Sequence, residues 1–278
     1  MEVSEKRYIE HVLNDAIVSN NACGKIETKS GATYFIKSGK YSRAYQCEAN
    51  GLNELIKADC IRVARPIIAT DTFIVTEYIS QEAPNKNFFV RLGKEVARLH
   101  LVHGKYYGFY ENNYIGSTVQ KNISVGYERE DWCTFYLNKR LLYQLELALR
   151  NGANSKVLES GVDFFTKHLK EILGENEELP SLLHGDLWGG NYLCDEYNNP
   201  VLIDPAVYFG DREADIAMTL LFGGFPENFY KGYEQVYPLR KGWRNRIGVY
   251  QLYHILNHFN MFGGGYLYES ERLIKLYI

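Results

Sequence analysis

The segment His184–Asn191, with the sequence HGDLWGGN, constrains this chain more than any other. Within it, Asn191 follows Asp186 after five residues, and Asp204 follows after thirteen more, at the end of the apolar run Pro200–Ile203. The polar residues before that run predict a turn and the run itself predicts a strand, so a hairpin would bring Asn191 close to Asp204. The pattern therefore predicts that the Asn191 carboxamide and the Asp204 carboxylate lie together, and that the Asp186 carboxylate lies apart from them.

Such a distribution of oxygen atoms suits phosphoryl transfer from ATP. One base, here Asp186, must face the acceptor hydroxyl, while two ligands hold Mg²⁺ on the nucleotide phosphates. Mg²⁺ keeps several waters in its octahedral shell, so Asn191 and Asp204 are enough from the protein. The alternative is that each Asp only caps a turn, a common place for this residue. The three residues in combination favour the phosphoryl-transfer site.

Composition fits an enzyme with a large core, because 46% of the 278 residues are hydrophobic and 14% are aromatic. A formal net charge of −3 offers no polybasic surface for nucleic acid or an anionic membrane. No segment approaches the length of a membrane span, and the N-terminus has no signal-peptide pattern. Five scattered cysteines without a Cys-x-x-Cys pair indicate reduced thiols. We expect a cytoplasmic protein with no nucleic-acid or membrane partner.

Periodicity predicts two lobes. The first, residues 1–79, is small and rich in strands, and a polar hinge at 80–87 leads into a larger, mostly helical lobe, residues 80–278. In the second lobe, His100 is expected to be a core residue. The expected strands cover residues 24–29, 33–37, 65–70 and 73–79, and the expected helices cover 4–18, 43–57, 89–102 and 132–149.

Two features of the small lobe would bind the nucleotide. Lys37 ends a predicted strand and Glu48 lies on the next helix, the order in which kinases form the ion pair that holds a Lys on the phosphates. Each could also be a solvated surface charge. Asn20–Gly24 occupies the place of a phosphate-binding loop, although it has only one glycine. Exposed backbone N–H groups can bind phosphate without further glycines. Cys23 would then lie near the nucleotide, or else be a small buried apolar residue.

The residues also carry a family resemblance. Residues 180–191 and 204–218, which contain the motifs above, resemble the fructosamine kinase (ketosamine 3-kinase) family. The resemblance covers nearly the whole chain. Gly189 departs from it, since the family often has Ser there, and so does the glycine-poor phosphate loop. The further matching segments are residues 34–37, 47–52, 113–116, 120–122, 221–226, 250–258 and 262–265.

This resemblance implies an α+β, two-lobed fold similar to those of protein kinases and aminoglycoside phosphotransferases. It also implies ATP-dependent phosphorylation of the 3-hydroxyl of ketosamines, free or protein-bound, giving an unstable phosphate that decomposes and frees the amine. By position, it matches Asp215 to a buried acid that braces the catalytic loop. It matches Glu77, Tyr78 and Ile79 to the hinge that meets the adenine, mainly through backbone groups.

Three further side chains have two interpretations each. Trp188 either forms a wall on which a sugar ring rests or anchors the catalytic loop in the core. Asp211 and Glu213 either receive the ammonium group of a ketosamine or form a surface salt bridge with Arg212.

Other functions share part of this pattern. A kinase for an aminoglycoside, choline or another amino alcohol would have the same catalytic residues. A protein kinase is disfavoured because no Ala-Pro-Glu motif or long activation segment follows Asp204. A nucleotide-binding pseudokinase that acts as an interaction module would not need the intact base and metal ligands. The pattern is compatible with a monomer or a homodimer.

Overall fold

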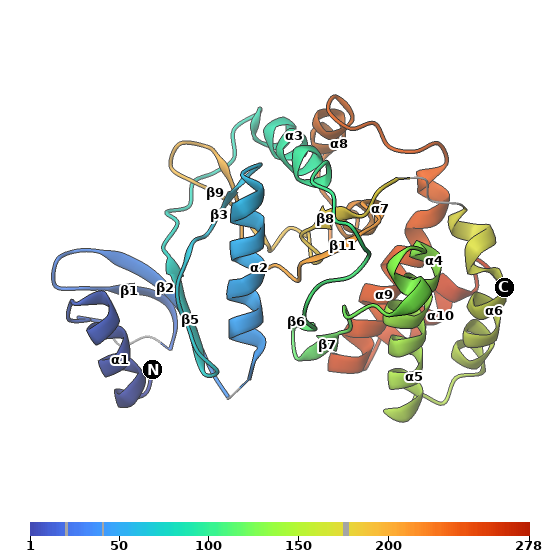
Figure 1. Cartoon of the computed structure of the whole chain (residues 1–278), viewed down its shortest axis with the longest axis horizontal. Coiled ribbons are helices and arrows are strands. Elements are labelled where there is room, and N and C mark those ends of the chain that lie inside the picture. Colours follow the sequence, from blue (N-terminus) through green and yellow to red (C-terminus); the bar gives the residue numbers. More distant parts are fainter. Residues whose placement is uncertain (20–21, 41, 175–177) are drawn as a thin grey trace.

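The computed structural model describes residues 1–19, 22–40, 42–174 and 178–278. A small lobe built around a β-sheet lies beside a larger helical lobe (Figure 1). This is the α+β, two-lobed arrangement that the periodicity predicted. We propose residue 79, at the end of the last strand of the small lobe, as the boundary between the lobes.

The small lobe is an antiparallel sheet in the order β1-β2-β5-β4. Its strands carry short apolar runs, and Ile26, Ile36 and Val75 form one buried face against Ile9 of the first helix. A second helix lies on the other side of the sheet (Figure 1). The elements are α1 (Val3–Leu13), β1 (Cys23–Glu27), β2 (Thr33–Ser38), α2 (Ala44–Ala58), β4 (Pro66–Ala69) and β5 (Phe73–Glu77).

All four strands predicted for this lobe are confirmed within two residues of their ends. The first helix is shorter than predicted, since it ends at Leu13 rather than near residue 18. Asn14 adopts the left-handed conformation there, with φ of 51°, and its N–H bonds carbonyls of the last turn. Asn tolerates this conformation better than most residues, so it ends the helix. The chain then turns, and Ile17 forms a β-bridge to Thr28.

A second, mixed sheet joins the lobes. The predicted hairpin is present as β9 (Tyr192–Cys194) and β10 (Pro200–Leu202), which pair antiparallel. The other edge of β10 pairs in parallel with β3 (Arg62–Val63), which belongs to the small lobe. Because the hairpin carries Asn191 and Asp204 at its open end, this sheet fixes both residues relative to the small lobe.

The large lobe is mostly helical. Its predicted helix over 132–149 is helical throughout but has a π-helix at Leu137–Leu141, which widens the backbone where Arg140 is buried. No helix in the described part of the chain is long and apolar enough to cross a membrane. The α-helices are α3 (Phe88–His100), α4 (Trp132–Tyr136), α5 (Leu142–Arg150), α6 (Lys156–Leu173), α7 (Glu213–Met218), α8 (Glu227–Glu234), α9 (Trp243–Phe262) and α10 (Tyr266–Ile274).

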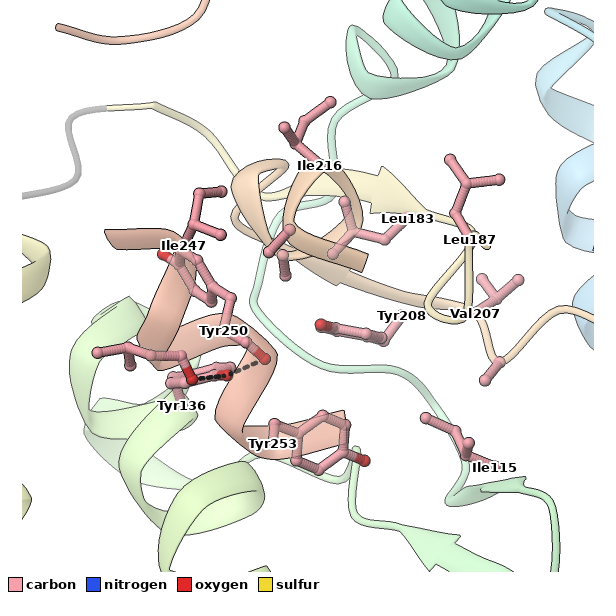
Figure 2. Packing of buried hydrophobic residues seen from close by; sticks show 14 of the residues in the cluster. Ile115, Tyr136, Leu183, Leu187, Val207, Tyr208, Ile216, Ile247, Tyr250 and Tyr253 are labelled. Atoms are coloured by element: carbon pink, nitrogen blue, oxygen red, sulfur yellow. Dashed lines mark hydrogen bonds between the residues drawn. The ribbon is translucent and has the colours of Figure 1, made fainter. Parts of the chain in front are cut away.

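One hydrophobic core runs through the large lobe and into the small one. Leu52 of α2 belongs to the same buried cluster as Tyr250 of α9 and Leu187, which lies in the candidate catalytic loop, residues 184–191. Figure 2 shows part of this cluster, in which Tyr208 lies between Val207 and Tyr250 of α9. Tyr208 lies in β11 (Tyr208–Gly210), which pairs with β8 (Ser181–Leu183) directly before the catalytic loop. The loop is therefore packed on its inner side by the core.

Candidate active site

The backbone of the catalytic loop is held by one buried carboxylate. Asp215, 1% exposed, accepts the N–H of His184 at Oδ2 (2.7 Å) and the N–H of Gly185 at Oδ1 (2.9 Å). His100, fully buried as predicted, donates from Nε2 to the same Oδ2 (3.2 Å). Burial acts to raise the pKa of Asp215, but the His100 contacts and these hydrogen bonds lower it overall. Asp215 is therefore ionised and can brace the loop as expected.

His184 is a second support that the sequence pattern did not assign. Its Nε2 lies 2.9 Å from the carbonyl of Ile203, which can only accept, so Nε2 carries the proton. Nδ1 then accepts the N–H of Asp186 at 3.3 Å. Burial lowers the pKa of His184, which favours this neutral form. One imidazole thus links the backbone of Asp186 to the residue before Asp204.

Only glycine fits at position 185. Its φ of +83° is in the left-handed region, and a Cβ there would lie 2.0 Å from the backbone oxygen of Ala206. The N–H of Ala206 donates to the carbonyl of His184 at 2.8 Å. The catalytic loop and the segment after Asp204 therefore run in backbone contact.

Asn191 orients the candidate base. Its Nδ2 donates to the backbone oxygen of Asp186 (2.7 Å) and to Oδ2 of the same residue (3.0 Å). Burial raises the pKa of Asp186 to about 7; the Asn191 hydrogen bond opposes the shift, and the charges of Asp204 and Asp215 add to it. Because the amide nitrogen of Asn191 is engaged, Oδ1 is left as an acceptor with no hydrogen-bond donor among the described residues.

Lys37 joins the two lobes. Its Nζ lies 2.6 Å from Oε1 of Glu48 and 2.6 Å from Oδ1 of Asp204. Burial acts to lower the pKa of Lys37, but the two carboxylates more than offset it, so the ammonium stays charged. The predicted Lys37–Glu48 pair is thus confirmed as a contact, and the contact to Asp204 was not foreseen. Asp204 itself has φ of +54°, a left-handed conformation that costs energy and is often found at functional sites.

Two cavities meet at these three charged residues. One has a volume of about 550 Å³ and the other of about 510 Å³, and residues of both lobes line each of them. Both are lined by Lys37, Glu48 and Asp204. Asp186 and Asn191 line only the second. We call the first the hinge cavity and the second the acceptor cavity.

The hinge cavity has the three residues expected at an adenine site. Glu77, Tyr78 and Ile79 line it together, at the end of β5. The Glu77 carboxylate is engaged, since Oε1 accepts the N–H of Arg65 at 3.0 Å. Adenine would therefore be bound by backbone groups of these residues rather than by the Glu77 carboxylate. Adenine binding here stays a prediction.

The predicted phosphate loop differs from expectation at its end. Asn20 and Asn21 lie outside the described residues. Cys23 and Gly24 belong to strand β1 rather than to a turn. Cys23 is exposed and lines the hinge cavity, so the interpretation as a buried apolar residue is wrong. All five cysteines are free thiols, as expected.

Trp188 lines the acceptor cavity and is half-buried, with its ring edge against Phe222 at 5.9 Å between centroids. It is not one of the core residues. The ring lies over Gly190, where a Cβ would be 2.5 Å from it. The geometry fits the wall for a sugar ring better than the anchor, and that role stays a prediction.

Asp211 and Glu213 correct the sequence prediction. Both are buried, at 2% and 0% exposure, and neither lines either cavity. Arg240 lies 2.5 Å from Oδ2 of Asp211 and 3.0 Å from Glu213, and Arg246 lies 2.6 Å from Glu213. The expectation that they receive a substrate ammonium is wrong, because their charge is already neutralised. The alternative is wrong too, since Arg212 is buried and pairs with Glu178 at 2.7 Å.

This network predicts a stability effect. Glu213→Gln keeps the side-chain volume but removes the buried charge that two partly buried guanidinium groups share. We expect the free energy of unfolding to fall by about 3–5 kcal/mol, measured by urea denaturation. Glu227→Gln is the matched control, because its ion pair with Lys231 is exposed and should change stability by less than about 0.5 kcal/mol. Equal losses in both variants would contradict the assignment.

Comparison with known proteins places the chain in a family. The sequence profile of the fructosamine kinase family matches residues 10–278. A protein of Synechocystis sp. named a probable ketoamine kinase is 39% identical over 249 residues, covering 87% of this chain and 82% of the relative. The chain belongs to the fructosamine kinase family. Family membership makes it a kinase that transfers phosphate from ATP to a hydroxyl group.

Other fructosamine kinase relatives and structures are similar. The chloroplastic protein-ribulosamine 3-kinase of Arabidopsis thaliana is 36% identical, covering 93% of this chain and 79% of the relative. A protein provisionally designated fructosamine-3-kinase from Thermobifida fusca has a TM-score of 0.88 at 27% identity, with 98% and 97% of the two chains covered. The aminoglycoside phosphotransferase APH(2'')-Ib, bound to ADP, shares the fold with a TM-score of 0.62 at 11% identity and full coverage of both chains.

The departure at Gly189 is tolerated in this fructosamine kinase. Gly189 is exposed and lines the hinge cavity, and a Cβ there would meet nothing within 4 Å. The Ser that the family often has would therefore fit without rearrangement. Glycine at this position removes a hydroxyl from the cavity and leaves its shape unchanged.

Proposed function

We propose that this chain is a ketosamine 3-kinase, which phosphorylates the 3-hydroxyl of a fructosamine, ribulosamine or erythrulosamine adduct on an amine or a protein lysine. One observation carries the proposal: two cavities meet at Lys37, Glu48 and Asp204, and Asp186 lines only one of them. A donor nucleotide in the hinge cavity and an alcohol in the acceptor cavity would then meet at the charged residues.

Each residue has a task in this reaction. Asp186 accepts the proton of the attacking hydroxyl and orients it for in-line attack. Lys37 offsets negative charge on the transferred phosphate, and Glu48 keeps the ammonium in place. Trp188 supports the sugar ring. Catalysis by these groups consists of positioning and charge neutralisation.

The donor set fits magnesium. Oδ1 of Asn191 and Oδ2 of Asp204 have no hydrogen-bond donor among the described residues, and both are hard oxygen ligands. Nowhere in the described part of the chain do three or more His, Cys, Asp or Glu side chains cluster as a metal site. That suits Mg²⁺, which takes one or two protein ligands and completes its shell with water and phosphate. When bound, the ion would neutralise charge on the nucleotide phosphates.

The substrate class is tested by ATP consumption across a panel of acceptors. We expect turnover with ketosamines carrying different sugars, and little with aminoglycosides or choline at equal concentration. The reaction should require a divalent cation and release the amine after phosphorylation. Preference for an aminoglycoside or choline would replace the proposal with the related kinase. Absence of turnover with any alcohol, together with retained ATP binding, would favour the pseudokinase.

The reaction has a repair outcome. Phosphorylation at the 3-position gives an unstable ester, and its decomposition returns the free amine from a glycated one. The enzyme would therefore reverse early glycation. Acceptors attached to protein lysines and to small amines both belong in the panel.

A further inference from the structure

We propose that the hairpin of β6 (Asn113–Ile115) and β7 (Thr118–Gln120) is the acceptor-recognition element of this enzyme, and that the hydroxyls of Tyr114 and Ser117 hydrogen-bond the sugar alcohol presented to Asp186. The inference rests on the proposed function for the identity of the acceptor. The position of the hairpin relative to the reacting groups is a property of the fold.

The tip of the hairpin is a wall of the acceptor cavity. The four successive residues 114–117 line it together with Asp186 and Trp188, and none of them lines the hinge cavity. Tyr114 is half-buried and Ser117 is exposed. Neither side-chain hydroxyl has a hydrogen-bond partner within the described ranges of the chain. Two free hydroxyl groups at a cavity wall are suited to the hydroxyls of a sugar.

Buried amides attach the hairpin to the segment that follows Asp204. Nδ2 of Asn113 donates to the carbonyl of Val207 (2.8 Å), and Nε2 of Gln120 donates to the carbonyl of Ala206 (2.8 Å). Nε2 of Gln120 also donates to Oδ1 of Asn113 (2.9 Å). Both amides are almost fully buried, at 3% and 0% exposure, so breaking these bonds would leave unsatisfied polar groups. The distance from the tip to Asp204 is therefore fixed.

A second layer holds the amides. Arg140, fully buried, donates from NH2 to Oδ1 of Asn122 (2.8 Å), and Asn122 donates to Oδ1 of Asn113 (2.7 Å). The guanidinium lies 4.1 Å from the ring centre of Tyr208, a cation–π contact in the core. Tyr253 donates its hydroxyl to Oε1 of Gln120 (3.1 Å). This layer extends from α9 and the π-helix to the hairpin.

Packing places the hairpin at the junction of the lobes. Ile115 of β6 is buried in the same cluster as Val207 and Tyr253, and all three are labelled in Figure 2. In Figure 1, β6 and β7 lie between α2, which carries Glu48, and the helices of the large lobe. Gly116, with φ of +59°, lets the tip approach α9, because a Cβ there would lie 2.5 Å from Sδ of Met261. The tip is thus held on both sides.

Single-atom variants test the inference. Tyr114→Phe and Ser117→Ala each remove one hydroxyl. We expect each to raise the KM for the acceptor about three- to tenfold, the equivalent of one hydrogen bond, with an unchanged KM for ATP and an unchanged Tm. Tyr110→Phe is the control, since Tyr110 precedes the hairpin, is exposed and lines neither cavity. An unchanged acceptor KM in both variants, or an equal rise in the KM for ATP, would overturn the inference.

Deoxy analogues of the acceptor sharpen the test. An analogue that lacks the contacted hydroxyl should be a weaker substrate for the wild type and should no longer distinguish wild type from the matching variant. Equal effects of the substitution on acceptor and analogue would show a structural role only and overturn the contact.

The acceptor for these assays is whichever alcohol of the panel the wild type phosphorylates. If that alcohol is not a ketosamine, the proposed function fails, but the KM comparison still decides the role of the hairpin. If the wild type phosphorylates no alcohol, the enzymatic proposal and the hairpin assignment fail together.

Discussion

Asp186→Asn is expected to lower kcat by about 10³-fold while the Kd for ATP stays within about twofold. The amide keeps the size of the carboxylate but cannot accept the hydroxyl proton. Asp186 lines the acceptor cavity and not the hinge cavity, so nucleotide binding should survive the change. Steady-state kinetics with the preferred acceptor give kcat, and titration with a fluorescent ATP analogue gives the Kd.

The control for this substitution is Asp163→Asn, which makes the same chemical change at an exposed position of α6. It should leave kcat unchanged. Turnover of Asp186→Asn within tenfold of the wild type would show that another group accepts the proton. A loss of ATP binding as large as the loss of kcat would instead mean that the carboxylate holds the loop together.

The second large effect is expected for Asp204→Asn. The substitution removes the charge that faces Lys37 and weakens one of the two proposed Mg²⁺ ligands. We expect kcat/KM to fall by about 10³-fold and the Mg²⁺ concentration for half-maximal activity to rise at least about tenfold. Activity measured across a Mg²⁺ titration checks both values.

Asp204→Asn should not add backbone strain that would alter the result. Asp204 has φ of +54°, and Asn adopts the left-handed conformation as readily as Asp. Asp59→Asn is the matched control, because Asp59 has φ of +51°, is exposed, ends α2 and lines neither cavity. It should retain full activity and the wild-type dependence on Mg²⁺. Unchanged dependence on Mg²⁺ in Asp204→Asn would remove this residue from the metal site.

Local features of the fold were predictable. Strand β2 contains the apolar run Tyr34–Ile36, strand β5 begins with the apolar run Phe73–Val75, and the β9–β10 hairpin has a polar turn, so short windows of sequence contain the information. The end of α1 was misjudged because apolar spacing continues past Leu13, whereas the left-handed Asn14 ends the helix. Helix ends depend on single-residue conformations that periodicity does not record.

Burial of charge was not predictable. Asp211 and Glu213 follow Asp204, which lines both cavities, within nine residues. Because acidic residues are usually exposed, a contact with the substrate was a reasonable hypothesis. The partner of Asp211 is Arg240, 29 residues further along and just before α9. The partner of Glu213 is Arg246, 33 residues further along and on α9. The amides of the β6–β7 hairpin are a similar case. Asn113 and Gln120 lie close together in the sequence, but they donate to backbone carbonyls 94 and 86 residues away.

The order of the chemical groups is readable along the chain: a lysine on a strand, a glutamate on the next helix, then the candidate base Asp186, the amide Asn191 and the carboxylate Asp204 at kinase-like intervals. Which of these groups touch follows from the folded chain alone. Lys37 reaches Asp204 across 167 residues, and Asp186 lies in one of two cavities that share three charged side chains. Periodicity records only which residues of one helix or strand share a face, whereas these long-range contacts form because one hydrophobic core packs the two lobes together.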